Sequence, residues 1–221
     1  MIKTYKFDTH IHTAESSICS TIPAAEMVDK YHAAGFSGIA ITDHLYAFAT
    51  TPYCDWDVFI DHLLRGYKAA KKRGDEIGLN VILSMELRFN NILSDFLIYG
   101  IDEAFLRANP FLQELTPQEF FKRHGDKLLI IQAHPYRVGY GAVFMDSIHG
   151  VEVYNGNNQG YHDNRNEKAQ ALCAAHPKYY PLKGSDAHSE TNMCTGWINL
   201  NRPATDSHQF CDLVKQREYV L

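Results

Sequence analysis

The sequence has few cysteines, and their spacing would not stabilise a fold by cross-linking. The five are odd in number, lie far apart and include no Cys-x-x-Cys pair: Cys19, Cys54, Cys173, Cys194 and Cys211. Disulfide-rich domains usually carry even numbers of cysteines, and structural zinc sites usually carry closely spaced pairs. We therefore expect ordinary reduced thiols, without a disulfide framework or a cysteine zinc finger.

The sequence also lacks a long apolar run and an excess of basic residues. No stretch reaches the roughly 18 apolar residues that span a bilayer, and residues 2–6 alternate between apolar and polar. The 21 lysines and arginines are outnumbered by 26 acidic residues, for a formal net charge of -5. Extended nucleic-acid binding is therefore disfavoured. We expect a cytoplasmic protein with no membrane partner.

Helical and strand patterns alternate along the whole chain. Its 221 residues, 45% of them hydrophobic, suit one domain spanning 1–221. Periodicity predicts strands at 5–12, 36–43, 80–89, 95–101, 127–133, 150–154, 179–183 and 197–200. It predicts helices at 22–34, 55–73, 116–124, 161–175 and 207–217. Repeated βα units of this length favour an α/β fold with a parallel sheet or barrel and right-handed crossovers.

Histidines and acids occur at the ends of successive predicted strands. The period of two along a strand places Asp8, His10 and His12 on one face. Later strands or strand ends carry Asp43, His44, Glu86, Asp95, His134, Glu152, Asn155, Asp186 and His188. Because the strand ends of a barrel form one face, these side chains would converge there. A single His-x-His is weak evidence, but its repetition at strand after strand predicts a metal site.

The residue types indicate which metals that site would hold. Imidazole together with carboxylate suits zinc, manganese or iron. The potential ligands also outnumber the four that one tetrahedral ion uses. We therefore expect two or three divalent ions. Such ions would generate an attacking hydroxide, which suits a metal-dependent hydrolase.

The motifs, taken in order, resemble those of the polymerase and histidinol phosphatase (PHP) superfamily. They are DTHIHT at 8–13, ITDH at 41–44, MELR around Glu86, QAHP at 132–135, GVEVYNG at 150–156 and GSDAH at 184–188. The resemblance covers essentially the whole chain. It implies a distorted (β/α)7 TIM-like barrel with a trinuclear metal centre that hydrolyses phosphoesters.

The resemblance also implies a ligand set. The first metal would be held by His10, His12, Glu86 and Asp186, and the second by Glu86, His134 and Asp95. Asp95 stands where the family has a histidine, and its added charge would favour a harder metal such as manganese or iron. The third metal would take His44 and His188. Its remaining ligand usually falls where this chain has Ser17 and Ile18, so Glu15 is the nearest replacement and Cys19 a second one.

Further residues are predicted to support the chemistry. Asp186 and Asp43 are the candidate catalytic carboxylates, and Asp43, like Asp8, could orient a metal-binding histidine or accept a proton. Arg137 and Arg165 are candidate phosphate contacts because guanidinium pairs with two phosphate oxygens. Asn155 is predicted to line the same pocket.

The resemblance and the chain's length favour hydrolysis of a small phosphomonoester or nucleotide-type substrate. One alternative is an amidohydrolase that cleaves a C–N bond, since those enzymes also place His-x-His on the first barrel strand. The GSDAH motif and the lack of an obvious carbamylated-lysine strand weigh against it. Another alternative is a metal-binding barrel without catalysis, which the altered second and third sites keep open. The sequence indicates no oligomeric state.

Overall fold

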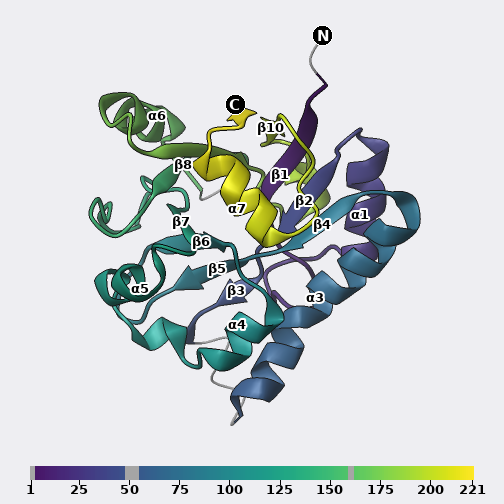
Figure 1. Cartoon of the computed structure of the whole chain (residues 1–221), viewed down its shortest axis with the longest axis horizontal. Coiled ribbons are helices and arrows are strands. Elements are labelled where there is room, and N and C mark those ends of the chain that lie inside the picture. Colours follow the sequence, from purple (N-terminus) through teal and green to yellow (C-terminus); the bar gives the residue numbers. More distant parts are fainter. Residues whose placement is uncertain (1–2, 48–54, 159–161) are drawn as a thin grey trace.

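The computed structural model describes residues 3–47, 55–158 and 162–221, and their strands form two sheets (Figure 1). In spatial order, the first sheet contains β11 (Tyr219–Val220), β10 (Ile198–Leu200), β1 (Tyr5–Ile11), β2 (Gly38–Ile41) and β4 (Asn80–Leu83). The second contains β3 (His44–Leu45), β5 (Met85–Arg88), β6 (Asp95–Tyr99), β7 (Leu129–Gln132), β8 (Gly150–Asn155) and β9 (Tyr180–Gly184). The expected α/β class, with parallel strand pairs, is confirmed.

The expected closed barrel is not formed by the described residues. The sheets remain separate ladders, and the isolated bridge among the described residues joins Ile11 of β1 to Ala187, beyond the end of β9. Strand β6 is antiparallel to both β5 and β7. Only residues 89–94 join β5 to β6, too few for the helical crossover that a parallel pair needs. The strand expected over 80–89 is likewise divided at Ser84, with β4 in one sheet and β5 in the other.

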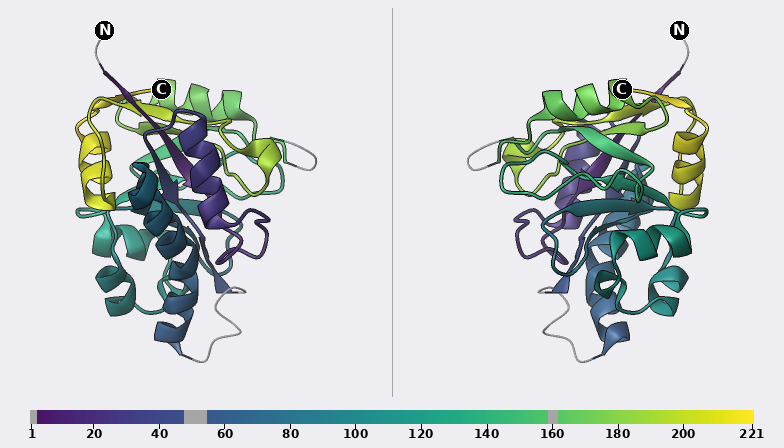
Figure 2. Two further views of the ribbon diagram at one scale, coloured as in Figure 1. Left: turned by 90° about the vertical axis from the view of Figure 1, so that its right-hand side faces the viewer. Right: turned by 90° about the vertical axis from the view of Figure 1, so that its left-hand side faces the viewer.

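Helices cover the outer faces of the two sheets. They are α1 (Ala24–Ala33), α3 (Trp56–Ile77), α4 (Glu103–Ala108), α5 (Pro117–His124), α6 (Asn166–Ala175) and α7 (Ser207–Lys215), with 3-10 turns at Leu112–Glu114 and Glu190–Asn192. Figure 2 shows α1 and α3 side by side against the first sheet. Helices α4 and α5 lie beside the second sheet, and α6 packs along β8. Among the described helices, none is sufficiently long and apolar to cross a membrane.

Local sequence signals explain where two of these helices begin and end. Thr116 and Glu119 form the capping box expected at the start of α5. Helix α3 starts after Asp55, whose side chain accepts backbone hydrogen bonds. It continues past Gly74, where the sequence predicted its end, and stops at Gly78, which has the left-handed φ of 85°. Gly74 instead allows the backbone at Leu79 to approach the helix closely, because a Cβ there would lie 2.5 Å from the carbonyl oxygen of Leu79.

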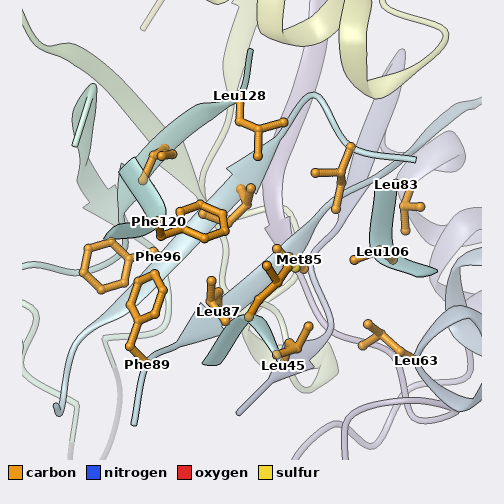
Figure 3. Packing of buried hydrophobic residues seen from close by; sticks show 14 of the residues in the cluster. Leu45, Leu63, Leu83, Met85, Leu87, Phe89, Phe96, Leu106, Phe120 and Leu128 are labelled. Carbon is orange, nitrogen blue, oxygen red and sulfur yellow. The ribbon is translucent and has the colours of Figure 1, made fainter. Parts of the chain in front are cut away.

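A large apolar cluster fills the space between the second sheet and helices α3, α4 and α5 (Figure 3). Met85, Leu87 and Phe96 supply the sheet side, while Leu63 and Phe120 come from helices. All five side chains are almost completely removed from water. Burial of apolar surface on this scale fixes the second sheet against its helices.

A second cluster lies between the two sheets and closes one end of the space between them. Ala40 and Ile82 of the first sheet meet Leu97 and Ile131 of the second, and Phe210 of α7 packs against them. Helix α7 lies at the Tyr99 end of β6, where Ser207 accepts a hydrogen bond from the backbone of residue 100. The other end of this space receives the carboxyl ends of the parallel strands and the beginning of β6.

Candidate metal centre

Four side chains aim their ligand atoms at one small volume at this end of the sheets. Nε2 of His10 lies 3.0 Å from Nε2 of His12. Each nitrogen lies 3.4 Å from an oxygen of Glu86 and 3.4 Å from Oδ1 of Asp186. A tetrahedral ion with bonds of about 2.0–2.1 Å separates its ligand atoms by about 3.3 Å. The spacings among His10, His12 and Asp186 therefore fit a metal ion, and Glu86 offers one oxygen to each histidine beside them.

Glu86 belongs to a second group as well. Its Oε1 lies 3.1 Å from Nε2 of His134, which lies 3.7 Å from Oδ2 of Asp95. The ligand atoms of these three residues all fall within 4.8 Å of one another. Asp95 reaches the cluster because β6 is antiparallel, which brings its first residue to the end where its neighbours finish. Glu86 can thus serve two adjacent ions.

A third group surrounds the ring of His12. The rings of His44 and His188 stack on it, with centroids 4.2 and 4.3 Å away, and the three offer ligand atoms within 4.8 Å. Nδ1 of His44 lies 2.9 Å from Oε2 of Glu86. The Cys19 thiol hydrogen-bonds both His44 and His188, and although burial would raise its pKa, these bonds lower it to about 6. Cys19 therefore lies beside this group, although it is not one of its three members.

Glu15, the other residue that the sequence suggested for the third position, lies elsewhere. Both of its carboxylate oxygens accept the backbone N–H of Ala24 at 3.0 Å. Ala24 is the first residue of α1, where an acidic side chain satisfies an unpaired donor and offsets the helix dipole. The structure does not bring Glu15 into any of the three groups.

Backbone conformation contributes to the placement of the ligands. His134 and Asp186 both have positive φ, 27° and 50°, in a region that few non-glycine residues adopt. Such strain concentrates at functional sites, where surrounding contacts hold it. Strand β9 passes close to β1, because a Cβ on Gly184 would lie 2.4 Å from the Cβ of His10. A glycine is therefore required beside the first histidine.

Buried partners hold the outer atoms of two ligands. Oε1 of Glu152 lies 3.0 Å from Nδ1 of His10, which leaves Nε2 of His10 facing the cluster. Nη2 of Arg137 donates to Oδ2 of Asp186 at 2.6 Å, which leaves Oδ1 facing the histidines. Arg137 also donates to Asn155 and Asn164 and is 6% exposed. Arg137, predicted as a phosphate contact, thus has three buried partners, and Asn155 lies in the same network.

Asp8 and Asp43 lie behind the cluster in polar networks. Asp8 accepts hydrogen bonds from Tyr31 and from Ser185. Both oxygens of Asp43 are used by Thr13, and one also accepts from Ser17, whose hydroxyl lies 3.5 Å from Nδ1 of His12. Burial raises the pKa of each carboxyl to about 6, against the lowering effect of these bonds. Asp43 is placed to orient His12 through Ser17.

The carboxylates and the basic side chains of the cluster stabilise each other's charged forms. Burial would lower the pKa of His10, but the carboxylates of Glu152, Asp186 and Glu86 raise it well above its usual value. Burial would raise the pKa of Asp186, but His10, His12 and Arg137 hold it well below its usual value. Ionised carboxylates beside imidazoles are the donor set that zinc, manganese and iron accept. The residues present therefore fit a divalent metal centre.

The cluster opens into a cavity of about 510 Å³. Its lining includes ligands of all three groups and Cys19, Arg88, Tyr140 and His162. Arg165 does not line it. That residue precedes α6 with a largely exposed side chain near Asp163. The cavity suits a small substrate.

The structure brings most of the sequence-predicted residues together, and it gives roles to two residues, Glu152 and Arg88, that had none in the sequence analysis. Glu152 was expected at a strand end within GVEVYNG, but nothing in that motif indicates that it faces His10. Arg88 follows Glu86 in MELR and faces the cavity, where it donates to both oxygens of Asp95 at 2.5 and 2.7 Å. No local signal pairs an arginine with an acid seven residues later in the next strand.

Comparison with known proteins gives both a family match and structural neighbours. The model of the PHP domain family matches residues 8–192. A two-domain protein from Bacteroides vulgatus containing a predicted PHP-like metal-dependent phosphoesterase superposes with a TM-score of 0.69 and 15% identity, covering 98% of this chain. This chain spans 64% of that protein's length. Among curated proteins, none matched the sequence.

Two further solved structures share the fold. One, from Bifidobacterium adolescentis, is provisionally named a metal-dependent phosphoesterase, with a TM-score of 0.55, 16% identity and coverage of 94% of this chain and 95% of that one. The other is an amidohydrolase from Chromobacterium violaceum with bound sulfate and no metal, with a TM-score of 0.55, 15% identity and 97% of each chain covered. At these identities the likeness is one of fold.

Proposed function

The chain belongs to the PHP domain family, and from that premise we propose that it is a metal-dependent phosphoesterase acting on a small phosphomonoester or nucleotide-type substrate. The observation that carries the proposal is the spacing of 3.0–3.4 Å among ligand atoms of His10, His12 and Asp186, with an oxygen of Glu86 3.4 Å from each histidine. The cavity of about 510 Å³ beside them has room for a small ester.

Two or three divalent ions, of zinc, manganese or iron, would be held by three groups of residues. The first group is His10, His12 and Asp186 with Glu86 beside them, the second is Glu86, Asp95 and His134, and the third is His12, His44 and His188, with Cys19 hydrogen-bonded to the last two. Glu15 is left out because its carboxylate is engaged by the backbone of Ala24, and Asp95 also pairs with Arg88. Bound divalent ions would lower the pKa of water and neutralise charge on a phosphoryl group.

Other residues of the chain hold the metal ligands in the orientation that binding needs. Glu152 fixes the ring of His10, and Arg137 holds one oxygen of Asp186 so that the other faces the histidines. Asp43 orients His12 through Ser17. Because these partners are buried and already bonded, the ligands need little reorganisation. Asp186 is the carboxylate that touches the reacting region, and Asp43 acts through its neighbours.

A panel of assays tests this proposal. Protein loaded with zinc, manganese or iron is offered p-nitrophenyl phosphate, a phosphodiester analogue, a set of nucleotides and simple amides. We expect phosphate release that falls at least about a hundredfold in His10→Ala and Asp186→Ala. His208→Ala is the matched control, because His208 is largely exposed and lies outside the cluster.

The amides address the second candidate function, hydrolysis of a C–N bond. The fold shared with the amidohydrolase from Chromobacterium violaceum keeps that reaction in the panel. Turnover of amides alone would contradict the phosphoesterase proposal. Metal binding without turnover of any substrate would instead favour a binding module.

A further inference from the structure

Arg88 is the arginine whose guanidinium is best presented to the cavity. It lies at the end of β5, two residues beyond Glu86, and its side chain is 31% exposed. It lines the cavity together with Glu86, His134 and Tyr140. We propose that Arg88 binds a tetrahedral oxyanion, the phosphoryl group of the substrate, and that Asp95 is its counter-ion rather than a metal ligand. The proposal rests on the phosphoesterase function proposed above.

The guanidinium is held in place on several sides. Nε and Nη2 donate to the two oxygens of Asp95 at 2.5 and 2.7 Å, and Nη2 donates to the hydroxyl of Tyr140 at 2.9 Å. The rings of Tyr140 and Tyr46 lie 5.4 and 6.0 Å from the guanidinium carbon, within cation–π range. An arginine fixed in this way loses little conformational entropy when it binds an anion.

The bonds to Asp95 and Tyr140 leave one edge of Arg88 available. Arginine has five N–H donors, two of them on Nη1. Within residues 3–47, 55–158 and 162–221, no acceptor is bonded to Nη1 of Arg88. The two N–H groups on Nη1 point in different directions, and each can donate one charge-assisted hydrogen bond to a phosphoryl oxygen. The free edge is therefore the part of Arg88 that would receive substrate.

The other two candidate arginines are less suited to this role. Arg137 is buried and donates to Asp186, Asn155 and Asn164. Arg165 is exposed and does not line the cavity. Arg88 combines a fixed position, partial exposure and contact with the cavity that also contains the metal-ligand groups.

The bidentate pair also changes the role expected of Asp95. Both of its oxygens lie within 2.7 Å of Arg88 nitrogens, whereas Oδ2 lies 3.7 Å from the nearest histidine nitrogen in its group. A metal at this position would have to compete with two charge-assisted hydrogen bonds. The second ion would then rely on Glu86 and His134, with Arg88 supplying positive charge beside it.

The test measures anion binding and metal content separately from turnover. Metal-loaded wild type, Arg88→Gln, Arg88→Lys and Asp95→Asn are titrated with inorganic phosphate by calorimetry, and bound metal is counted by mass spectrometry. The matched control is Arg202→Gln, because Arg202 forms an equivalent bidentate pair with Glu218, at 2.7 and 2.8 Å, far from this cavity. Arg88→Lys keeps the positive charge but loses the planar guanidinium. It can be used for the phosphate titration if Arg88→Gln folds poorly.

We expect Arg88→Gln to weaken phosphate binding about tenfold or more, as for loss of charge-assisted hydrogen bonds. Arg88→Lys should weaken it severalfold, and Arg202→Gln should not change it. Asp95→Asn should keep the wild-type metal content and weaken phosphate binding severalfold.

Two results would overturn the inference: phosphate affinity in Arg88→Gln equal to that of Arg202→Gln, or loss of one metal equivalent in Asp95→Asn. Ester hydrolysis that survives unchanged in Arg88→Gln would contradict this inference and leave the phosphoesterase function intact. Arg88-dependent phosphate binding without ester hydrolysis would support this inference and contradict the phosphoesterase function.

Discussion

Nδ1 of His10 lies 3.0 Å from Oε1 of Glu152, and both side chains are fully buried. The other oxygen of Glu152 accepts the backbone N–H of His134 and the side-chain amide of Asn155. A carboxylate behind a metal-binding histidine fixes the tautomer and the direction of the ring. Glu152 therefore links two of the candidate ligands to one buried charge.

Replacing Glu152 by glutamine should weaken metal binding by about 10- to 100-fold. A glutamine has one acceptor oxygen and cannot serve His10, His134 and Asn155 together. Competition with a metal chelator measures the affinity, and Glu167→Gln on the exposed side of α6 is the control. Equal affinity in the folded Glu152→Gln variant would contradict the positioning role.

Replacing Arg137 should move the acid limb of metal binding to higher pH. Asp186 must be ionised to bind a cation, and His10, His12 and Arg137 hold its pKa well below its usual value. Without Arg137 the pKa of Asp186 rises, so binding is lost earlier as the pH falls. Metal affinity of Arg137→Lys and Arg137→Gln as a function of pH tests this. A uniform loss of affinity at every pH would instead indicate general disruption.

Loading the protein with cobalt should show whether Cys19 is a metal ligand at the third group. The thiol hydrogen-bonds His188 and His44, and its pKa of about 6 makes it a thiolate at neutral pH. Protein loaded with Co²⁺ should show sulfur-to-cobalt charge-transfer absorption in the near ultraviolet, which Cys19→Ser should abolish. Cys173→Ser, which alters a partly buried cysteine against the apolar core, should leave the band unchanged. Persistence of the band in Cys19→Ser would exclude the thiol as a ligand.

His149 should make the unfolding free energy depend on pH. Burial and Lys215 lower its pKa from 6.5 to about 4, and its Nδ1 accepts the N–H of Ile130 at 3.0 Å. The unfolded chain therefore binds more protons between these values. Stability is full above about pH 6.5 and is lost as the pH falls toward about 4.

The measurement compares urea unfolding of wild type and His149→Asn at about pH 7.5 and about pH 5. Because the ring is only partly buried, we expect the wild type to lose about 1 kcal/mol more than the variant over this interval. His208→Asn, at an exposed histidine, should follow the wild type. Parallel pH curves for wild type and His149→Asn would contradict the assignment.

Regular elements were predictable where local signals and periodicity agree. The capping box at Thr116 and the strand pattern from Tyr5 appear in the structure as predicted. Helix α4 was missed because it is short and buries one residue, Leu106, so it leaves almost no periodic pattern. The division at Ser84 was missed because the apolar run continues through it, and which sheet each half joins depends on distant strands.

The site was predictable in its residue types and less so in its pairings. Histidines and acids at strand ends converge because parallel strands finish at the same edge. Whether a carboxylate faces an imidazole, a guanidinium or a helix start is decided by tertiary packing. Asp95 meets Arg88 and Glu15 meets Ala24 through such packing, and neither pairing has a spacing that the sequence would reveal.

The left-handed backbone at His134 and Asp186 limits how this centre could be redesigned. Asparagine, aspartate, histidine and glycine tolerate that conformation, whereas β-branched and bulky residues resist it. A library that varies the metal ligands at these two positions should therefore test asparagine and aspartate at His134, and asparagine and histidine at Asp186. His10 lies on β1 and His12 directly follows it, neither with positive φ, so both positions accept a wider choice of donor. Engineering of metal preference thus has most freedom on β1 and least at the two turns.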